Sequence, residues 1–179
     1  MLKRTLAASI LFLIMMQANA QIGAMKLVGN NTKDYGIGFG AFIKSGIPVS
    51  EGADLTLELG ANFFSEKGYG MHYGTLMCPL KAGYRYTLDG SGQGLYIEPQ
   101  AGFNLLGLTT IADNDGNDTD LKYHGVVLAA GAGYLFTIAG APFDLNLRYE
   151  TVIAHGGSNN MIALGLSRFI SFGKRNSDY

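Results

Sequence analysis

The stretch FDLNLRYETVI, Phe143 to Ile153, alternates between apolar and polar side chains over its whole length. One face carries Phe143, Leu145, Leu147, Tyr149, Thr151 and Ile153, and the other carries Asp144, Asn146, Arg148, Glu150 and Val152. A period of two predicts a β-strand, because successive side chains of a strand point to opposite sides. The pattern alone does not say which face is inside. The apolar face is buried in a soluble sheet, whereas the charged face is buried in a membrane barrel.

The same alternation recurs along the chain and predicts eight strands, at residues 21–29, 34–44, 53–64, 75–88, 95–105, 124–136, 143–153 and 161–172. Stretches rich in Gly, Asn, Asp, Ser and Pro separate them and predict turns or loops at 29–34, 45–52, 65–70, 89–94, 107–120, 139–142 and 155–160. No linker or shift in composition divides these segments. The sequence therefore predicts a single all-β domain.

Residues 1–20, MLKRTLAASILFLIMMQANA, have the order of parts found in a secretory signal peptide. Lys3 and Arg4 precede an apolar run, and Ala18-Asn19-Ala20 supplies small residues for cleavage after Ala20. The apolar run is too short to cross a bilayer as a helix, which argues against a retained anchor. We therefore expect residues 21–179 to form the folded domain.

The composition excludes several classes of protein. The chain has 13 Lys and Arg against 14 Asp and Glu, and losing Lys3 and Arg4 leaves a net charge of −3, which argues against nucleic-acid binding. Cys78 is the single cysteine, so no internal disulfide can form. It lies between Leu76 and Leu80 on an apolar face, as expected of a small hydrophobic residue and not of a reactive thiol. No apolar run is long enough for a membrane-spanning helix.

The aromatic residues favour the membrane alternative. If every strand reverses direction, the outward rings fall at two heights: Tyr84, Tyr86, Tyr134, Phe136, Phe143 and Phe172 at the starting side, and Tyr35, Phe63 and Phe103 at the opposite side. Two aromatic girdles around an aliphatic band are typical of transmembrane barrels. A charged fraction of 15% is also low for a soluble surface. The sequence thus predicts an eight-stranded antiparallel up-and-down transmembrane β-barrel, with a soluble sandwich as the alternative.

The charged faces of the predicted strands would then point into the lumen. The expected set of ion-paired residues comprises Asp54, Glu58, Lys81, Arg85, Glu98, Asp144, Arg148 and Glu150. Buried charges are tolerable when they are paired, and an eight-stranded barrel has a lumen that side chains fill. We therefore favour a structural network over an ion path or small-solute porin.

The signal peptide, the eight alternating segments, the girdles and a last strand ending in SRFISF together resemble the small outer-membrane β-barrel proteins of Gram-negative bacteria. This resemblance implies residence in the outer membrane after cleavage at Ala20, with membrane lipid and lipopolysaccharide as partners. It also implies insertion by the barrel-assembly machinery, which reads a terminal aromatic residue matched here by Phe172. The chain departs from the pattern in its tail, GKRNSDY, and in Arg168, which interrupts the apolar face.

The expected role is structural or surface-interacting, in a monomer without catalysis, cofactor or metal. A soluble periplasmic barrel that binds a small apolar ligand is one alternative. A second is a lipid A-modifying enzyme, because His72, His124 and His155 fall near the outer strand ends and HGGSNN places Ser158 close to His155. Glu150 would be its acid. The glycine-rich context favours a plain turn.

The segment ADNDGNDTD, residues 112–120, gathers Asp113, Asp115, Asp118 and Asp120. Oxygen-rich loops suit Ca²⁺, but a calcium-binding hand would need an acidic residue where Ile111 stands. We therefore expect a solvated outer loop, with divalent ions bridging it to lipopolysaccharide phosphates as the alternative.

Overall fold

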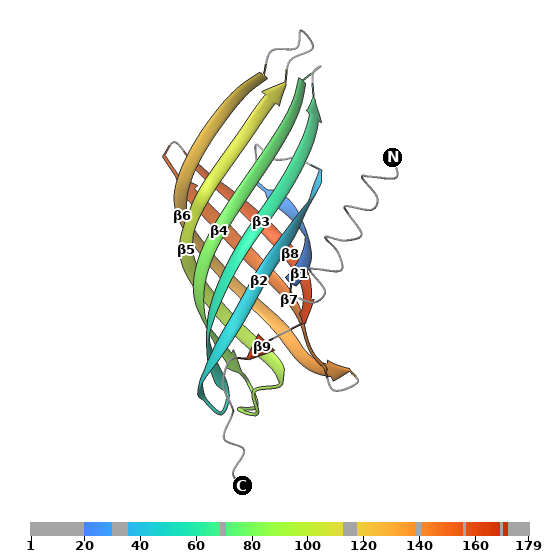
Figure 1. The fold of residues 1–179 in the computed structure, drawn as a ribbon, viewed down its shortest axis with the longest axis vertical. Coiled ribbons are helices and arrows are strands. Elements are labelled where there is room, and N and C mark those ends of the chain that lie inside the picture. The colour runs from blue at the N-terminus through green and yellow to red at the C-terminus, as the bar shows by residue number, and fades with distance from the viewer. Residues whose placement is uncertain are drawn as a thin grey trace.

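The computed structural model describes residues 20–29, 36–68, 71–112, 118–138, 141–155, 157–168 and 170–171 (Figure 1). The predicted signal peptide up to residue 19 and the predicted insertion residue Phe172 lie outside the described residues. Within the described part of the chain, no helix is long and apolar enough to cross a bilayer.

The described residues form β1 (Ala20–Val28), β2 (Ile37–Ser50), β3 (Ala53–Gly68), β4 (Met71–Thr87), β5 (Gly94–Ala112), β6 (Asp118–Ile138), β7 (Ala141–Ala154), β8 (Gly157–Arg168) and β9 (Ile170–Ser171). Each of the first seven strands pairs antiparallel with the next one in sequence, and β8 pairs antiparallel with β1. The ring is therefore closed, which confirms the predicted up-and-down barrel. The short β9 pairs in parallel with β2 at Ser45 and Gly46.

Several strands are longer than the sequence pattern predicted. β2 continues to Ser50, so the predicted turn at 45–52 shrinks to two residues, and Ile47 and Val49 continue the outward row. The predicted loop at 107–120 is wrong at both ends, because β5 runs to Ala112 and β6 starts at Asp118. β3 likewise reaches Gly68, and β8 begins at Gly157 within the predicted turn at 155–160.

The apolar face points out of the ring and the charged face points in. On β3, Leu55, Leu57 and Leu59 are 51%, 54% and 46% exposed, whereas Glu58 between them is fully buried. A soluble core would bury those leucines and leave the glutamate in water. The reversed pattern is that of a transmembrane barrel, with lipid outside and paired charges inside.

Exposed aromatic rings lie at two heights along the barrel: Tyr84, Tyr86 and Tyr134 are close to the last residues of β4 and β6, whereas Phe39 and Phe63, which pair in the β2–β3 register, lie toward the opposite end, and Phe103 is at the middle of β5. At the lower end Phe136 stacks against Tyr134 and Phe143, with ring centroids 6.2 and 5.8 Å apart. Tyr35, which was predicted to join the upper girdle, lies outside the described residues. Aromatic rings at two heights are typical of the two membrane interfaces.

Inward-facing glycines make room for large inward-facing rings. A Cβ at Gly60 would lie 2.6 Å from the Phe42 ring, and a Cβ at Gly38 would lie 2.4 Å from the Phe64 ring. Small barrels fill a narrow lumen by placing small residues opposite large ones. The glycines of strands such as GIGFGAF therefore serve the packing of the lumen.

Strands β3 to β6 rise above β1, β2, β7 and β8 at the upper end of the barrel (Figure 1). Among the described residues, β6 pairs with β5 from Asp118 onward but with β7 only from Gly125 onward. The described β2–β3 ladder ends at the Phe39–Phe63 pair, and beyond it the Gly36 N–H donates to the Ser65 carbonyl at 3.4 Å, whereas β3 pairs with β4 as far as Gly68. We call this four-stranded extension, formed by the upper parts of β3 to β6, the protruding sheet.

Candidate functional site in the lumen

The lower half of the lumen holds a layer of charged side chains from β2, β3, β4, β5 and β7. It consists of Lys44, Glu58, Lys81, Arg85, Glu98, Asp144, Arg148 and Glu150, each at most 5% exposed. We call this set the ionic layer. Seven of the eight residues that the sequence predicted for the lumen belong to it.

One half of the ionic layer is a ring of alternating charge. The Arg148 Nη1 donates to both carboxylate oxygens of Glu58, at 2.9 and 3.0 Å. The Lys81 Nζ lies 2.9 Å from Glu58 and 2.5 Å from Glu150. The Arg148 Nε, 3.3 Å from Glu150, completes the ring. Each buried charge here thus has two partners of opposite sign, which offsets the cost of removing it from water.

The other half of the ionic layer is centred on Arg85. Its Nη2 lies 2.9 Å from Asp144 and 3.4 Å from Glu98, and its guanidinium carbon lies 4.4 Å from the centroid of the Tyr96 ring. The Tyr96 hydroxyl donates to Asp144 at 2.5 Å. The Lys44 Nζ donates to Glu98, also at 2.5 Å. Tyr96 is thus a hydrogen-bond donor within the ionic layer. The sequence pattern did not predict this role, because a tyrosine counts as an apolar residue in it.

Lys44 connects the two halves and was missing from the predicted set. Its Nζ lies 3.9 Å from both Glu58 and Asp144, in addition to its bond to Glu98. The predicted strand ended at Lys44, although continued alternation after Phe42 would have placed it inside. Asp54 was predicted for this set, and the structure buries it opposite Arg85 in the β3–β4 register, where the two interact electrostatically.

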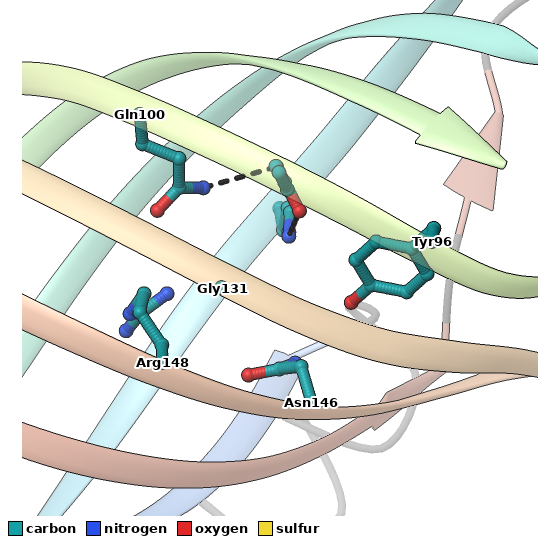
Figure 2. A pocket seen from close by; sticks show the side chains of 7 residues that line it. Tyr96, Gln100, Gly131, Asn146 and Arg148 are labelled. Carbon is teal, nitrogen blue, oxygen red and sulfur yellow. Dashed lines mark hydrogen bonds and ion pairs between the residues drawn. The ribbon is translucent and has the colours of Figure 1, made fainter. Parts of the chain in front are cut away.

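The ionic layer encloses a cavity of about 10 Å³ beside Gly131, where β6 supplies no side chain (Figure 2). Gln100 reaches it from β5, and Asn146 and Arg148 reach it from β7. A space of this size holds about one water molecule. It is too small to be part of an open channel.

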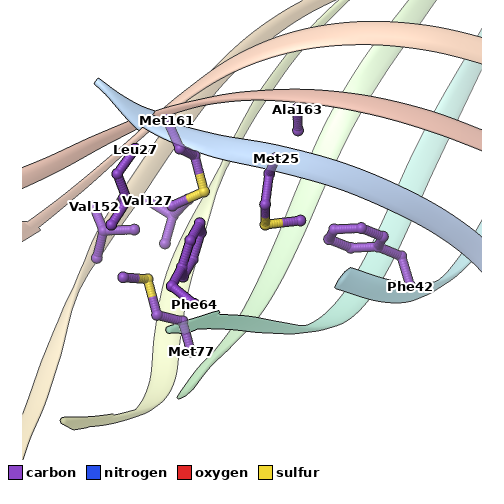
Figure 3. Close-up of a cluster of buried hydrophobic side chains, with 9 residues drawn as sticks. All are labelled: Met25, Leu27, Phe42, Phe64, Met77, Val127, Val152, Met161 and Ala163. Carbon is purple, nitrogen blue, oxygen red and sulfur yellow. The ribbon is translucent and has the colours of Figure 1, made fainter. Parts of the chain in front are cut away.

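Above the ionic layer lies a second, apolar layer that the sequence reasoning missed. It consists of Met25, Leu27, Phe42, Phe64, Met77, Val127, Val152, Met161 and Ala163, each at most 3% exposed (Figure 3). We call this set the apolar layer. The period-two pattern does place these residues on the inward face, but the expectation of a polar lumen drew attention to charges alone.

The residues of the enzyme alternative do not come together. His155 and Ser158 are exposed, and Ser158 is part of β8, paired with Ile153. Glu150, the acid of that hypothesis, points into the lumen and is engaged by Lys81 and Arg148. His124 is exposed on β6, and the side chain of His72 lies outside the description. The geometry thus gives no nucleophile–base–acid arrangement at these described residues.

The acidic segment 112–120 is described only at its ends. The Asp120 carboxylate accepts a hydrogen bond of 2.7 Å from the Thr110 hydroxyl. Asp113 and Asp115, like the side chain of Asp118, lie outside the described residues. No group of three or more His, Cys, Asp or Glu suited to a metal occurs among the residues that the structure covers. Calcium binding by the loop therefore stays a prediction.

The turn between β4 and β5 is fixed by side-chain hydrogen bonds. The backbone N–H and the hydroxyl of Ser91 donate to the Asp89 carboxylate and hold the pKa of Asp89 below its usual value. The Thr87 hydroxyl donates to the Gly52 carbonyl at 2.8 Å, which ties this turn to the β2–β3 turn. The lower end of the barrel is thus built from turns that support one another.

A closed eight-stranded ring with an apolar exterior and a charged, filled lumen has the architecture of a small outer-membrane β-barrel. The sequence matches no protein-family model and no curated protein at a significant level. Solved structures do match the fold. The attachment invasion locus protein Ail of Yersinia pestis, solved with a heparin analogue, matches with a TM-score of 0.57 and 10% identity, over 84% of this chain and 93% of Ail.

Two further barrels match over similar lengths. Neisserial surface protein A has a TM-score of 0.57 and 14% identity, over 83% of this chain and 92% of its own. The outer-membrane enzyme PagL has a TM-score of 0.51 and 12% identity, over 84% of this chain and 99% of its own. These neighbours support the resemblance to small outer-membrane barrels. Because PagL is an enzyme, whereas the others are an attachment invasion locus protein and a surface protein, the fold by itself leaves the role open.

Proposed function

We propose that the protein is a non-catalytic barrel of the Gram-negative outer membrane, closed to solutes, which acts at the cell surface through the protruding sheet. The observation that carries this proposal is the contrast between the two parts of the barrel. The lumen is filled with paired charges and packed apolar side chains, whereas the upper ends of β3 to β6 extend beyond the described ladders with β2 and β7.

The filled lumen supports the absence of transport. A solute would have to separate Glu58 from Arg148 and Lys81, each within 2.9 Å of its carboxylate, and the cavity beside them holds only about one water. Removing a single partner from such a buried group leaves an uncompensated charge, so the closed arrangement is strongly favoured.

The protruding sheet supports a role in binding. Among the described residues the β6–β7 ladder ends at Gly125, and the part of β6 above it carries exposed side chains at positions 120, 122 and 124, so a partner segment can approach this edge of the sheet. The edge carries Asp120 and Lys122 on its outward face, with acidic residues at 113, 115 and 118 nearby in sequence. This charge does not favour a polyanion such as the heparin analogue bound by Ail.

A trimmed variant tests the surface role. Replacing residues 109–121 by Asn-Gly joins Leu108 to Lys122, which are partners in the β5–β6 register, through a two-residue hairpin turn. Cells that display the full chain should bind immobilised extracellular proteins, and cells with the trimmed variant should not. Retained heat-dependent migration on gels would show that the trimmed barrel is folded.

Three outcomes would contradict the proposal. They are equal binding by trimmed and full-length barrels, steady ohmic channels from the purified wild type in planar bilayers, and altered lipid A masses on overexpression. The last outcome would favour the enzyme alternative, for which the described residues show no assembled site. Retention on heparin that disappears in the Lys122→Ala variant would instead indicate a polyanion as the partner.

A further inference from the structure

The apolar layer lies directly on the ionic layer. On β7 the next inward-facing residue above Glu150 is Val152, and on β2 the next one above Lys44 is Phe42. On β4 Pro79 and then Met77 follow above Lys81. The order is the same on each of these strands, so the two layers are stacked along the barrel axis.

Phe42 is the contact between the layers. The Arg148 guanidinium carbon lies 5.0 Å and the Lys81 Nζ lies 5.6 Å from the centroid of its ring. On its other side Phe42 belongs to the buried apolar cluster with Met25 and Phe64. If the ion pairs rearrange, an ion in the lumen therefore meets the Phe42 ring and not an open passage through the barrel.

The apolar layer is tightly packed. Phe64 and Val127 are fully buried, and Val127 is paired with Val152 in the β6–β7 register. Figure 3 shows the side chains of the layer pointing into one common space. None of these three residues lines the small lumen cavity, which lies within the ionic layer.

The two layers oppose the passage of an ion by different means. Carboxylates, ammonium groups and guanidinium groups can replace part of the hydration shell of an ion once their mutual pairs are broken. Methionine, valine and phenylalanine side chains offer no such compensation, and the one neutral amide of Asn62, which lies opposite Met77 and donates to the Met161 sulfur at 3.9 Å, replaces little of the hydration of an ion. Apolar constrictions close channels by excluding water in this way.

We propose that the apolar layer is a second barrier in series with the ionic layer, and that it keeps the barrel closed to ions when the ion pairs are broken. This inference rests on the closed lumen of the proposed function, and it names the residues that keep the lumen closed. Neutralising Glu58, which removes its ion pairs with Arg148 and Lys81, then leaves the barrel without conductance, whereas a polar substitution in the apolar layer of the same protein lets ions pass.

The test is the conductance in planar bilayers of four refolded full-length proteins. These are the wild type, Glu58→Gln, Glu58→Gln with Phe64→Ser, and Glu58→Gln with Phe63→Ser. Phe63 is the matched control, because it neighbours Phe64 but is 52% exposed on the outer face. We expect steady current steps from the variant with Phe64→Ser and from none of the other three.

The outcomes separate the inference from the proposed function. Channels in the wild type would refute the closed lumen itself. A silent wild type with channels in Glu58→Gln alone would overturn the second barrier and leave the closed lumen standing. The second barrier would also be refuted if the folded variant with Phe64→Ser showed no conductance, or if the Phe63→Ser control conducted as well as it does. If the Phe64→Ser combination fails the gel-migration test for folding, Val127→Thr takes its place, since it adds a hydroxyl at nearly constant volume.

Discussion

Replacing Glu58 by alanine should destabilise the barrel more than the alanine replacement of a neighbouring lipid-facing leucine. Glu58 is fully buried and accepts bonds from Arg148 and Lys81, with Lys44 3.9 Å away. Removing one partner of a buried ion pair typically costs about 3–5 kcal/mol. Arg148 and Lys81 both keep Glu150 as a partner, so we expect a loss near the lower end, about 3 kcal/mol.

The assay is equilibrium unfolding by denaturant from lipid vesicles. The chain has no tryptophan, so far-UV circular dichroism is the suitable signal. Leu57→Ala is the matched control, since Leu57 is the outward neighbour of Glu58, and its loss should cost less than about 1 kcal/mol in a bilayer. Glu58→Gln keeps the shape of the side chain, so its loss of stability should lie between those of Glu58→Ala and Leu57→Ala.

A double-mutant cycle isolates the ion pair. The variants Glu58→Gln, Arg148→Gln and their combination should give a coupling energy of about 2 kcal/mol, as for hydrogen bonds between charged groups. The reasoning is refuted if Glu58→Ala costs no more than Leu57→Ala, or if the coupling energy is close to zero.

Two further substitutions test the packing and the orientation of the strands. Gly60→Ala should cost about 1–3 kcal/mol, because its Cβ would lie 2.6 Å from the Phe42 ring, and Phe42→Leu in the same chain should recover part of that loss; an unchanged unfolding midpoint for Gly60→Ala would contradict this packing. Leu147→Arg, near the middle of β7 on the outer face, should lower the free energy of unfolding by about 2–4 kcal/mol. Ile138→Arg, at the lower end of β6, should lower it by less than about 1 kcal/mol, because this position is close to the membrane interface. Equal losses would contradict the placement of Leu147 deeper in the bilayer than Ile138.

The faces of the strands were predictable because side-chain alternation is a local property. The stretch FDLNLRYETVI was assigned correctly as a strand, with Leu147 outside and Arg148 inside. Strand ends were less predictable. Thr110 and Asp120 lie in the protruding sheet, where polar residues occupy the outward face, so the apolar rows that mark a strand are lost.

The ion pairs of the lumen were predictable in kind but not in detail. Glu58 and Lys81 face each other in neighbouring strands, whereas Glu58 and Arg148 are 90 residues apart and meet only across the closed ring. Which charges meet there depends on the stagger of the whole barrel, and no short segment determines that stagger. The apolar layer was missed for another reason, because Phe64 and Val127 break the expected polar inner face.

The orientation of the side chains is tested most directly by spin labels in vesicles. In a Cys78→Ala background, single cysteines at Leu145, Leu147, Asn146 and Val152 carry a nitroxide label, and its collision rates with oxygen and with a water-soluble nickel complex are measured. We predict high oxygen accessibility at Leu145 and Leu147 and low accessibility to both reagents at Asn146 and Val152. Equal accessibility along the strand, or nickel access at Leu147 above oxygen access, would contradict an apolar face in lipid around a charged interior.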